Sequence, residues 1–355
     1  MRNLKYDCCK GISIISIVMF HCHLLPAFIC AGTFVFNLFF FVFAGLMFKR
    51  EIINNFNDLY DYFKKIFKRY AKPYIISNLL FLISYNFFVK YHFIMIDNKY
   101  GYGHLLSLGE ILKKSFSHIL VISHAEVLNG ASWFLKSLFW GLLLYSFAIL
   151  LCNILNKIKT LNGINLRYTL YFLIFIFGSY IVYITDNTYV LFLYISLTCI
   201  FIGDLLKRLI QNFKFNPVYY GASILLIAAS IVITDKQFYF VSLLIGGFSS
   251  FYFIYATSIF LEKFKKIFNL FVFLGQNTLP ILLLHLISFK LITFIYINVY
   301  SLPKSDLGFF PVIDYSGTFF VAVLWKILYL TSGIVIPVIL FKLFSIKYPS
   351  TKTEK

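Results

Sequence analysis

Charged side chains are scarce in this chain, and acidic side chains are the scarcest. Only 13% of the 355 residues are charged, with 14 Asp and Glu against 32 Lys and Arg, whereas 60% are hydrophobic and 21% aromatic. A soluble domain carries about 25% charged residues. The composition therefore excludes a soluble globular protein and predicts a membrane protein with several spans.

Acidic residues are missing from the middle of the apolar runs, because all 14 lie in polar stretches or at the ends of runs. Proton-coupled pumps and transporters carry Asp and Glu inside their membrane helices. The pattern therefore disfavours a proton-coupled transporter, although it leaves a substrate flippase open.

Metal-binding cysteine motifs and signal-peptide features are also absent. The six cysteines have no metal-type spacing and avoid the long polar loops, so neither a metal site nor a disulfide framework is expected. The first apolar run, 11–30, is too long for the apolar core of a signal peptide and lacks a small-residue cleavage site. It predicts a membrane helix that stays in the protein.

Long apolar runs are what the sequence has in abundance, and a span needs about 20 residues. The runs are 11–30, 31–48, 73–89, 133–155, 168–184, 189–203, 218–234, 238–261, 270–297 and 318–344. They predict an all-α fold, a polytopic membrane helical bundle of about ten transmembrane helices. Residues 1–346 would form one membrane domain and residues 347–355 a short cytoplasmic tail.

The net charge of +18 is unevenly distributed between the two sides of these runs. Most Lys and Arg fall in the stretches that ten spans place on the side of the termini, so the positive-inside rule predicts that both termini are cytoplasmic. The charge is thus a topology signal and not a nucleic-acid signal. We expect the lipid bilayer as partner and the bacterial cytoplasmic (inner) membrane as location.

The longest polar stretch, 90–132, contains an amphipathic segment at 105–121 that predicts an interfacial or re-entrant helix. Four candidate functional side chains lie in this stretch. They are His104, His118, His124 and Glu126.

Lys10 directly precedes the first apolar run and His21 lies within it, and an ionisable group inside a membrane segment indicates a functional site. Eleven residues of helix place His21 about 16 Å beyond Lys10. His285 lies about 21 Å along the run 270–297, so both histidines are expected near the middle of the membrane. Either could act as a general base or join two helices by a hydrogen bond. His23 faces the other side of its helix and is expected to be structural.

A basic segment, Lys64–Lys72, ends at Pro73, which is expected to open the third span. It is either plain topology signal or a phosphate site. In the second interpretation Arg69 supplies a bidentate fork, and Lys65, Lys68 and Lys72 supply point charges. Coenzyme A, with its pyrophosphate and 3′-phosphate, needs such a cluster, and a helix N-terminus at Pro73 would add to it.

The aromatic segment Phe39–Gly45 is interpreted mostly as lipid-facing side chains, with Gly45 allowing close helix approach. Trp133 opens the run 133–155, where an interfacial tryptophan is common.

In this order along the chain, these segments resemble the acyltransferase-3 family of integral-membrane acyltransferases, and its fucose-4-O-acetylase-like and polysaccharide O-acetyltransferase branch in particular. Tyr6–His21 is similar to the opening Asp-x-x-[Arg/Lys]-Gly and [Arg/Lys]-x10-His patterns, and Phe39–Gly45 to Phe-Phe-x-x-Ser-Gly, with Ala44 at the serine. Lys65–Tyr74 is similar to a basic loop that runs into Pro-Tyr. Trp133-Phe-Leu and Leu274–His285 are similar to the later Trp-[Phe/Tyr]-Leu and Leu-Gly-x-x-Ser-Leu-…-His elements.

The resemblance implies a membrane O-acyltransferase, most simply an O-acetyltransferase, with acetyl-CoA as donor and no metal. His21 and His285 would be catalytic, and Lys10 with Lys65, Lys68, Arg69 and Lys72 would hold the donor. Trp133, Glu126 and Asn277 are expected to contact the acceptor, a cell-envelope polysaccharide or its lipid-linked precursor.

The departures from the family pattern limit these roles. Ala44 has no hydroxyl, so no serine acts there. No esterase domain of the SGNH type follows the last run, so the membrane domain would act directly or pass the acyl group to a partner transferase. The sequence does not indicate whether the chain forms a homo-oligomer. Two other functions stay open, a polyisoprenoid-linked glycan flippase or transporter, and a membrane glycan polymerase that uses the 90–132 stretch.

Overall fold

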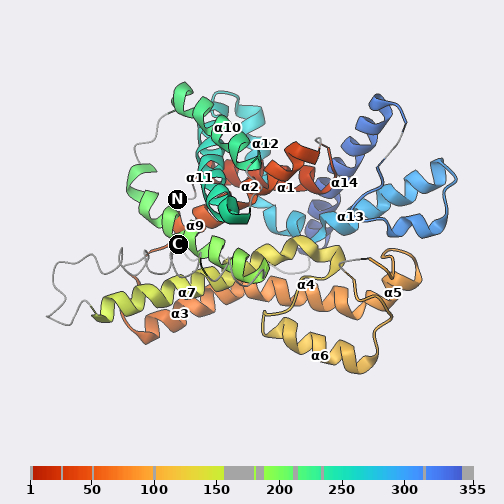
Figure 1. Cartoon of the computed structure of the whole chain (residues 1–355), viewed down its shortest axis with the longest axis horizontal. Coiled ribbons are helices and arrows are strands. Elements are labelled where there is room, and N and C mark those ends of the chain that lie inside the picture. Colours follow the sequence, from red (N-terminus) through yellow and green to blue (C-terminus); the bar gives the residue numbers. More distant parts are fainter. Residues whose placement is uncertain are drawn as a thin grey trace. The chain divides into compact units, whose positions relative to one another are not determined.

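The computed structural model describes residues 3–24, 27–49, 52–98, 101–155, 180, 188–210, 215–232, 236–314 and 317–345 (Figure 1). Every regular element in these ranges is a helix, which confirms the all-α prediction for this part of the chain. The elements are α1 (Leu4–His21), α2 (Ala27–Leu46), α3 (Phe56–Ile66), η2 (Phe67–Ala71), α4 (Lys72–Ile83), α5 (Tyr85–Lys90), α6 (Leu108–Ile119), η3 (Val127–Ser132), α7 (Trp133–Leu155), α9 (Thr188–Ile210), α10 (Pro217–Val232), α11 (Lys236–Leu261), α12 (Lys265–Gln276), α13 (Thr278–Val299), η5 (Lys304–Gly308) and α14 (Phe319–Ser345).

Among the described residues, five helices are long and apolar enough to cross a membrane, which makes the chain a multi-pass membrane protein. They are Val127–Leu155, Val190–Lys207, Leu244–Leu261, Thr278–Val299 and Phe319–Leu343, and two shorter apolar helices are Asn37–Leu46 and Pro217–Ser230. The predicted span 168–184, apart from residue 180, and the tail 347–355 lie outside the described residues.

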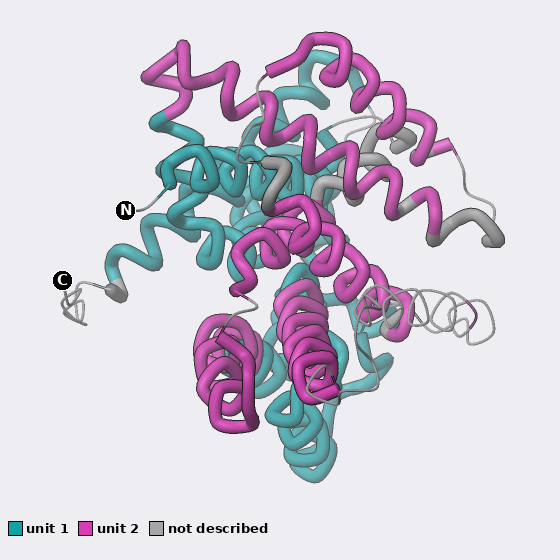
Figure 2. The backbone as a smooth tube through the Cα atoms, turned by 90° about the vertical axis from the view of Figure 1, so that its left-hand side faces the viewer, with its two compact units in different colours: residues 1–30, 76–132, 269–355 teal, residues 31–75, 133–268 magenta. Residues whose placement is uncertain are grey.

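The chain divides into two compact units, shown in teal and magenta in Figure 2, and each contains segments that are distant in the sequence. Unit 1 consists of residues 1–30, 76–132 and 269–355, and unit 2 of residues 31–75 and 133–268.

In unit 1, helices α1 and α12 cross with their backbones in contact. A Cβ placed on Gly11 would lie 2.0 Å from the Phe271 carbonyl oxygen, and one placed on Gly275 would lie 1.7 Å from the Asp7 carbonyl oxygen. Each helix therefore needs glycine at the crossing. Helix α1 also packs against α13 and α14, and α13 packs along α14.

Substituting alanine for Gly11 is expected to destabilise unit 1, because the new methyl group overlaps the α12 backbone, which cannot move as a side chain can. Overpacking of this kind costs about 1–3 kcal/mol. A thermal unfolding scan of the purified protein would show a lower midpoint for Gly11→Ala.

Gly109→Ala is the matched control, because a Cβ there meets nothing within 4 Å and alanine favours helix α6. A Gly11→Ala protein as stable as Gly109→Ala would contradict the backbone crossing.

Unit 2 has the same kind of crossing between α2 and α9. A Cβ on Gly45 would lie 1.9 Å from the Ile200 carbonyl oxygen, and one on Gly203 would lie 1.9 Å from that of Val42. The prediction that Gly45 allows close helix approach is confirmed.

The lipid-facing interpretation of the Phe39–Gly45 segment is wrong. Phe39 and Phe41 are fully buried. Phe39 stacks on Phe251 with ring centroids 5.5 Å apart, and Phe41 packs against Phe134 at 4.7 Å. Lipid tails are as apolar as a helix-bundle core, so hydrophobicity alone did not distinguish these two environments.

One acidic residue lies deeper in a helix than predicted. Asp204 was placed at the edge of the short run 189–203, but α9 continues to Ile210 and the Asp204 side chain is buried. Its carboxylate accepts a hydrogen bond from the Tyr145 hydroxyl on α7. The bond satisfies a buried polar group and joins the two helices.

Two predicted helix boundaries are wrong. Helix α1 ends at His21, and His23 has the left-handed φ of 52°, so the run 11–30 is not one helix. The run 270–297 is split between α12 and α13 at Asn277, whose φ and ψ of −106° and 21° are not helical. His21 therefore terminates its helix, and His285 lies only about 10 Å from the start of α13.

Helix α4 begins at Lys72, so Pro73 lies in its first turn as predicted, but this helix has no free N-terminus. The chain is helical without interruption from Phe56 to Ile83, with a π-helical turn at Phe67–Ala71. The Lys72 amide donates to the Phe67 carbonyl, five residues earlier, which inserts an extra residue where Pro73 has no N–H to donate. No helix N-terminus therefore adds to the basic segment.

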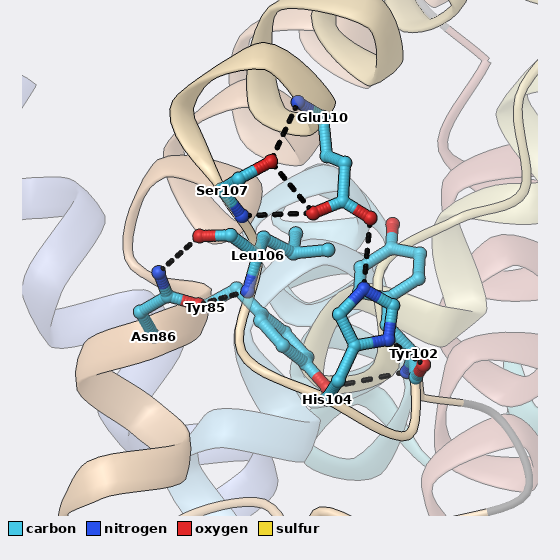
Figure 3. Close-up of polar contacts among 7 residues, drawn as sticks. All are labelled: Tyr85, Asn86, Tyr102, His104, Leu106, Ser107 and Glu110. Carbon is cyan, nitrogen blue, oxygen red and sulfur yellow. Dashed lines mark hydrogen bonds and ion pairs between the residues drawn. The ribbon is translucent and has the colours of Figure 1, made fainter.

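The 76–132 part of unit 1 carries the predicted amphipathic helix, observed as α6 at Leu108–Ile119. Ser107 and Glu110 form a capping box at its start, and the Asn86 side chain both donates to and accepts from the Leu106 backbone (Figure 3). His104 lies 2.8 Å from a Glu110 carboxylate oxygen, so its pKa is raised and that of Glu110 is lowered to about 2, chiefly by hydrogen bonds to Ser107 and His104.

Two lysines inside predicted spans fasten the polar segment before α14. The Lys290 ammonium donates to the carbonyl oxygens of Leu307 and Phe309, at 2.8 and 2.6 Å, and Lys326 pairs with Asp314. Long basic side chains reach polar groups at helix ends in this way. The segment is thereby held to both α13 and α14.

Candidate active site

The two histidines predicted to be catalytic meet in unit 1, although 264 residues separate them. His21 Nδ1 lies 3.0 Å from His285 Nε2, and the ring centroids are 5.0 Å apart. His285 is fully buried, whereas His21 is partly exposed. The end of α1 and the first third of α13 therefore form a single site.

The contacts of His285 fix which atom carries each proton. Its Nδ1 lies 2.9 Å from the Ile281 carbonyl oxygen, which can only accept, so Nδ1 carries the proton. In neutral His285 the Nε2 atom is then an acceptor, and His21 Nδ1 must donate to it.

This arrangement leaves His21 Nε2 with a lone pair. A neutral imidazole that donates through one nitrogen presents the other as a base or a nucleophile. His285 then holds the reactive tautomer of His21, as the third member of a catalytic triad does. The pair can accept a proton from a hydroxyl group or form a bond to an acyl group.

Lys10 lies on the same helix, eleven residues before His21, which is about three full turns, so both side chains project from one face of α1. Its ammonium is 2.5 Å from the carboxylate of Asp7, which is buried. Asp7 was not predicted as a partner of Lys10, although their i,i+3 spacing favours an ion pair on a helix.

Unit 2 carries the other four predicted donor-binding residues. Lys65, Lys68, Arg69 and Lys72 are all exposed, and spacings of three and four residues gather them on one side of the α3–η2–α4 helix. The π-helical turn lies among them, and such turns occur often at functional sites. The structure thus presents an accessible row of positive charge.

Trp133 also lies in unit 2, in an aromatic cluster. Its ring centroid is 4.5 Å from that of Phe192 and 6.5 Å from that of Phe41. The second and fourth sequence motifs, Phe39–Gly45 and Trp133-Phe-Leu, therefore meet. The first and last motifs meet in unit 1, through the glycine crossing and the histidine pair.

Glu126 and Asn277 have different surroundings. Glu126 is buried, and its carboxylate accepts hydrogen bonds from Tyr102 and His118, at 2.6 and 2.8 Å. The Asn277 side chain donates to the Phe273 carbonyl at the α12–α13 junction. It lies eight residues, about 12 Å along α13, from His285, so the structure does not bring it to the histidine pair.

Comparison with known proteins identifies the family. The family model described as an acyltransferase domain, acyltransferase type 3, matches residues 3–342. The chain belongs to the acyltransferase-3 family. Neither the curated proteins nor the solved structures gave a match. Family membership and the membrane-crossing helices together make this chain a membrane acyltransferase, with all five motifs inside the matched range.

Proposed function

We propose that this acyltransferase transfers an acetyl group from cytoplasmic acetyl-CoA to a hydroxyl group of a cell-envelope polysaccharide or its lipid-linked precursor. The observation that carries the proposal is the hydrogen bond between His21 and His285, because it leaves the Nε2 atom of His21 available as a base. The chain would cross the bacterial inner membrane ten times with both termini in the cytoplasm, as the charge distribution favours.

In the reaction, His21 Nε2 takes the proton of the acceptor hydroxyl as its oxygen attacks the thioester carbonyl. The new C–O ester bond forms, the C–S bond breaks, and the proton on His21 passes to the coenzyme A thiolate. His285 accepts a stronger hydrogen bond from His21 Nδ1 while His21 is positively charged. The alternative order, in which His21 Nε2 first carries the acetyl group, uses the same atoms.

The donor would bind at the exposed basic row of unit 2, since Arg69 offers the planar fork that suits phosphate. Lys10 is proposed as a further contact for the donor. Trp133 is proposed as an acceptor contact in its aromatic cluster.

The proposal is tested with the purified full chain in nanodiscs, supplied with acetyl-CoA labelled in the acetyl group. We expect the labelled thioester to disappear and the labelled acetyl group to be recovered in an envelope glycan fraction. A protein that binds and moves lipid-linked glycan but never cleaves acetyl-CoA would be a flippase. Polymerisation of glycan that depends on the 90–132 segment would indicate a polymerase.

Replacing Arg69 by alanine is expected to weaken acetyl-CoA binding, because each lost hydrogen bond to a charged group is worth about 1.5–3 kcal/mol. Raised salt should weaken the binding of the unmodified protein as well. Isothermal titration calorimetry measures both effects.

Lys304→Ala is the control for Arg69→Ala, because it removes one exposed positive charge from a distant segment of the sequence. Equal donor affinity in the Arg69→Ala and Lys304→Ala proteins would assign the basic row to topology alone.

A further inference from the structure

Helix α6 has an apolar face that remains exposed in the described structure. Leu108, Leu112 and Phe116 follow one another at four-residue intervals, and their exposed fractions are 73%, 63% and 64%. They lie on one side of the helix. The face continues into neighbouring exposed residues on both sides of the stripe, which are Leu105, Ile119, Leu120 and Ile122.

The opposite face of α6 is already packed, so the helix cannot roll over to bury the exposed one. Ile111 packs against the core cluster of unit 1 that contains Leu82, Tyr85 and Val127. His118, in the last turn, is fully buried. An exposed apolar face on a helix fixed from behind indicates a binding surface.

Hydrogen bonds hold α6 at the end of a membrane-crossing helix. His118 Nε2 is 2.8 Å from Glu126 Oε1, and the Glu126 amide donates to Asn78 at 2.8 Å. Glu126 directly precedes Val127, where the apolar helix Val127–Leu155 begins. The last turn of α6 therefore lies at the level at which the chain enters the bilayer.

Lysines border the apolar face. Lys113 follows Leu112 and is exposed, and the Lys114 ammonium lies 3.9 Å from the centre of the Tyr102 ring. Amphipathic helices that lie in the membrane interface have an apolar face in the acyl boundary and lysines at the phosphate headgroups. A protein partner would not need the face to coincide with the membrane level.

We infer that α6 lies in the membrane interface and that its occupant is bilayer lipid. Leu108, Leu112 and Phe116 are immersed at the boundary of the acyl chains, and Lys113 contacts the phosphate headgroups. This inference goes beyond the proposed function and does not depend on it, because it concerns a surface remote in sequence from both catalytic histidines.

A consequence that does rest on the proposed function concerns the acceptor. Helix α6 connects through Glu126 to η3, which packs against α13, the helix of His285. A Cβ on Gly130 in η3 would lie 3.6 Å from Leu286. The segment that contacts lipid is thus joined to the catalytic helix, which favours an acceptor presented at the membrane surface, a lipid-linked sugar, over a free polymer.

Spin labels on α6 test the membrane contact. Single cysteines replace Leu108, Leu112 or Phe116 in a cysteine-free full chain, in vesicles of phosphatidylethanolamine and phosphatidylglycerol, and Lys113 is the matched control position. Collision with oxygen should exceed collision with a water-soluble nickel reagent at the three apolar positions and fall below it at Lys113. If the nickel reagent reaches the apolar positions, the inference is overturned. It is also overturned if neither reagent reaches them, an outcome that would indicate a protein partner or a second copy of the chain.

A double variant tests the acceptor. Leu112→Gln with Phe116→Gln should lower transfer to a lipid-linked acceptor at least tenfold while acetyl-CoA hydrolysis, which needs only donor and water, stays unchanged. If the double variant loses transfer to a water-soluble acceptor to the same extent, the inference of a lipid-linked acceptor would be overturned, whereas the inferred contact of α6 with the membrane would stand. If the unmodified protein does not hydrolyse acetyl-CoA at all, the proposed function itself would be overturned.

Discussion

Replacing His21 by alanine is expected to lower the rate of acyl transfer by about 10²–10⁴-fold, the usual cost of losing a general base. The reason is geometric, since His21 Nε2 is the atom of the histidine pair that retains a lone pair. Expression, membrane insertion and acetyl-CoA binding should stay near normal, because the side chain is at the end of α1 and outside the basic row. The measurement is acetyl transfer at saturating donor, beside donor affinity from calorimetry.

His23→Ala is the matched control. His23 is two residues away, outside α1, and its ring nitrogen lies 3.2 Å from an Asp314 carboxylate oxygen. Its loss removes that contact and leaves the histidine pair in place, so the rate should change little. Near-normal transfer in the His21→Ala protein would contradict the mechanism.

The sequence predicted most helices because apolar periodicity and length are local properties. The run 133–155 coincides with α7, and the amphipathic segment 105–121 contains α6. The helix ends at His21 and at Asn277 were not predicted, because one non-helical residue barely changes the mean hydropathy of a long run. The π-helical turn before Pro73 was not predicted either, because a proline in the sequence indicates the first turn of a helix and not whether another helix runs into it.

Within the site, the sequence identified His21 and His285 one at a time, from their position in apolar runs. Their contact depends on the packing of α1 against α13, which neither run encodes by itself. The tautomer of His21 depends further on the Ile281 carbonyl, a backbone group that every residue possesses. The burial of Phe39 and Phe41 could not be predicted either, because lipid tails and the interior of a helix bundle favour the same apolar side chains.

Replacing His285 by leucine is expected to lower the rate about 10²-fold or more, since removing the group that fixes the tautomer of a catalytic histidine can cost about 10⁴-fold. Leucine fills the buried space but accepts no hydrogen bond from His21 Nδ1. The proton is then free to move to Nε2, where it blocks the reactive lone pair. Steady-state transfer rates across a range of pH give the measurement.

His285→Gln separates this positioning role from a role in packing. A glutamine side chain can place its carbonyl oxygen near the former Nε2 position and accept the same hydrogen bond. The glutamine protein should therefore recover most of the rate and keep the acid limb of its pH–rate profile, whereas the leucine protein shows a shifted limb. If both variants lose the same activity with unshifted profiles, His285 supports the structure alone, and His21 works without an orienting partner.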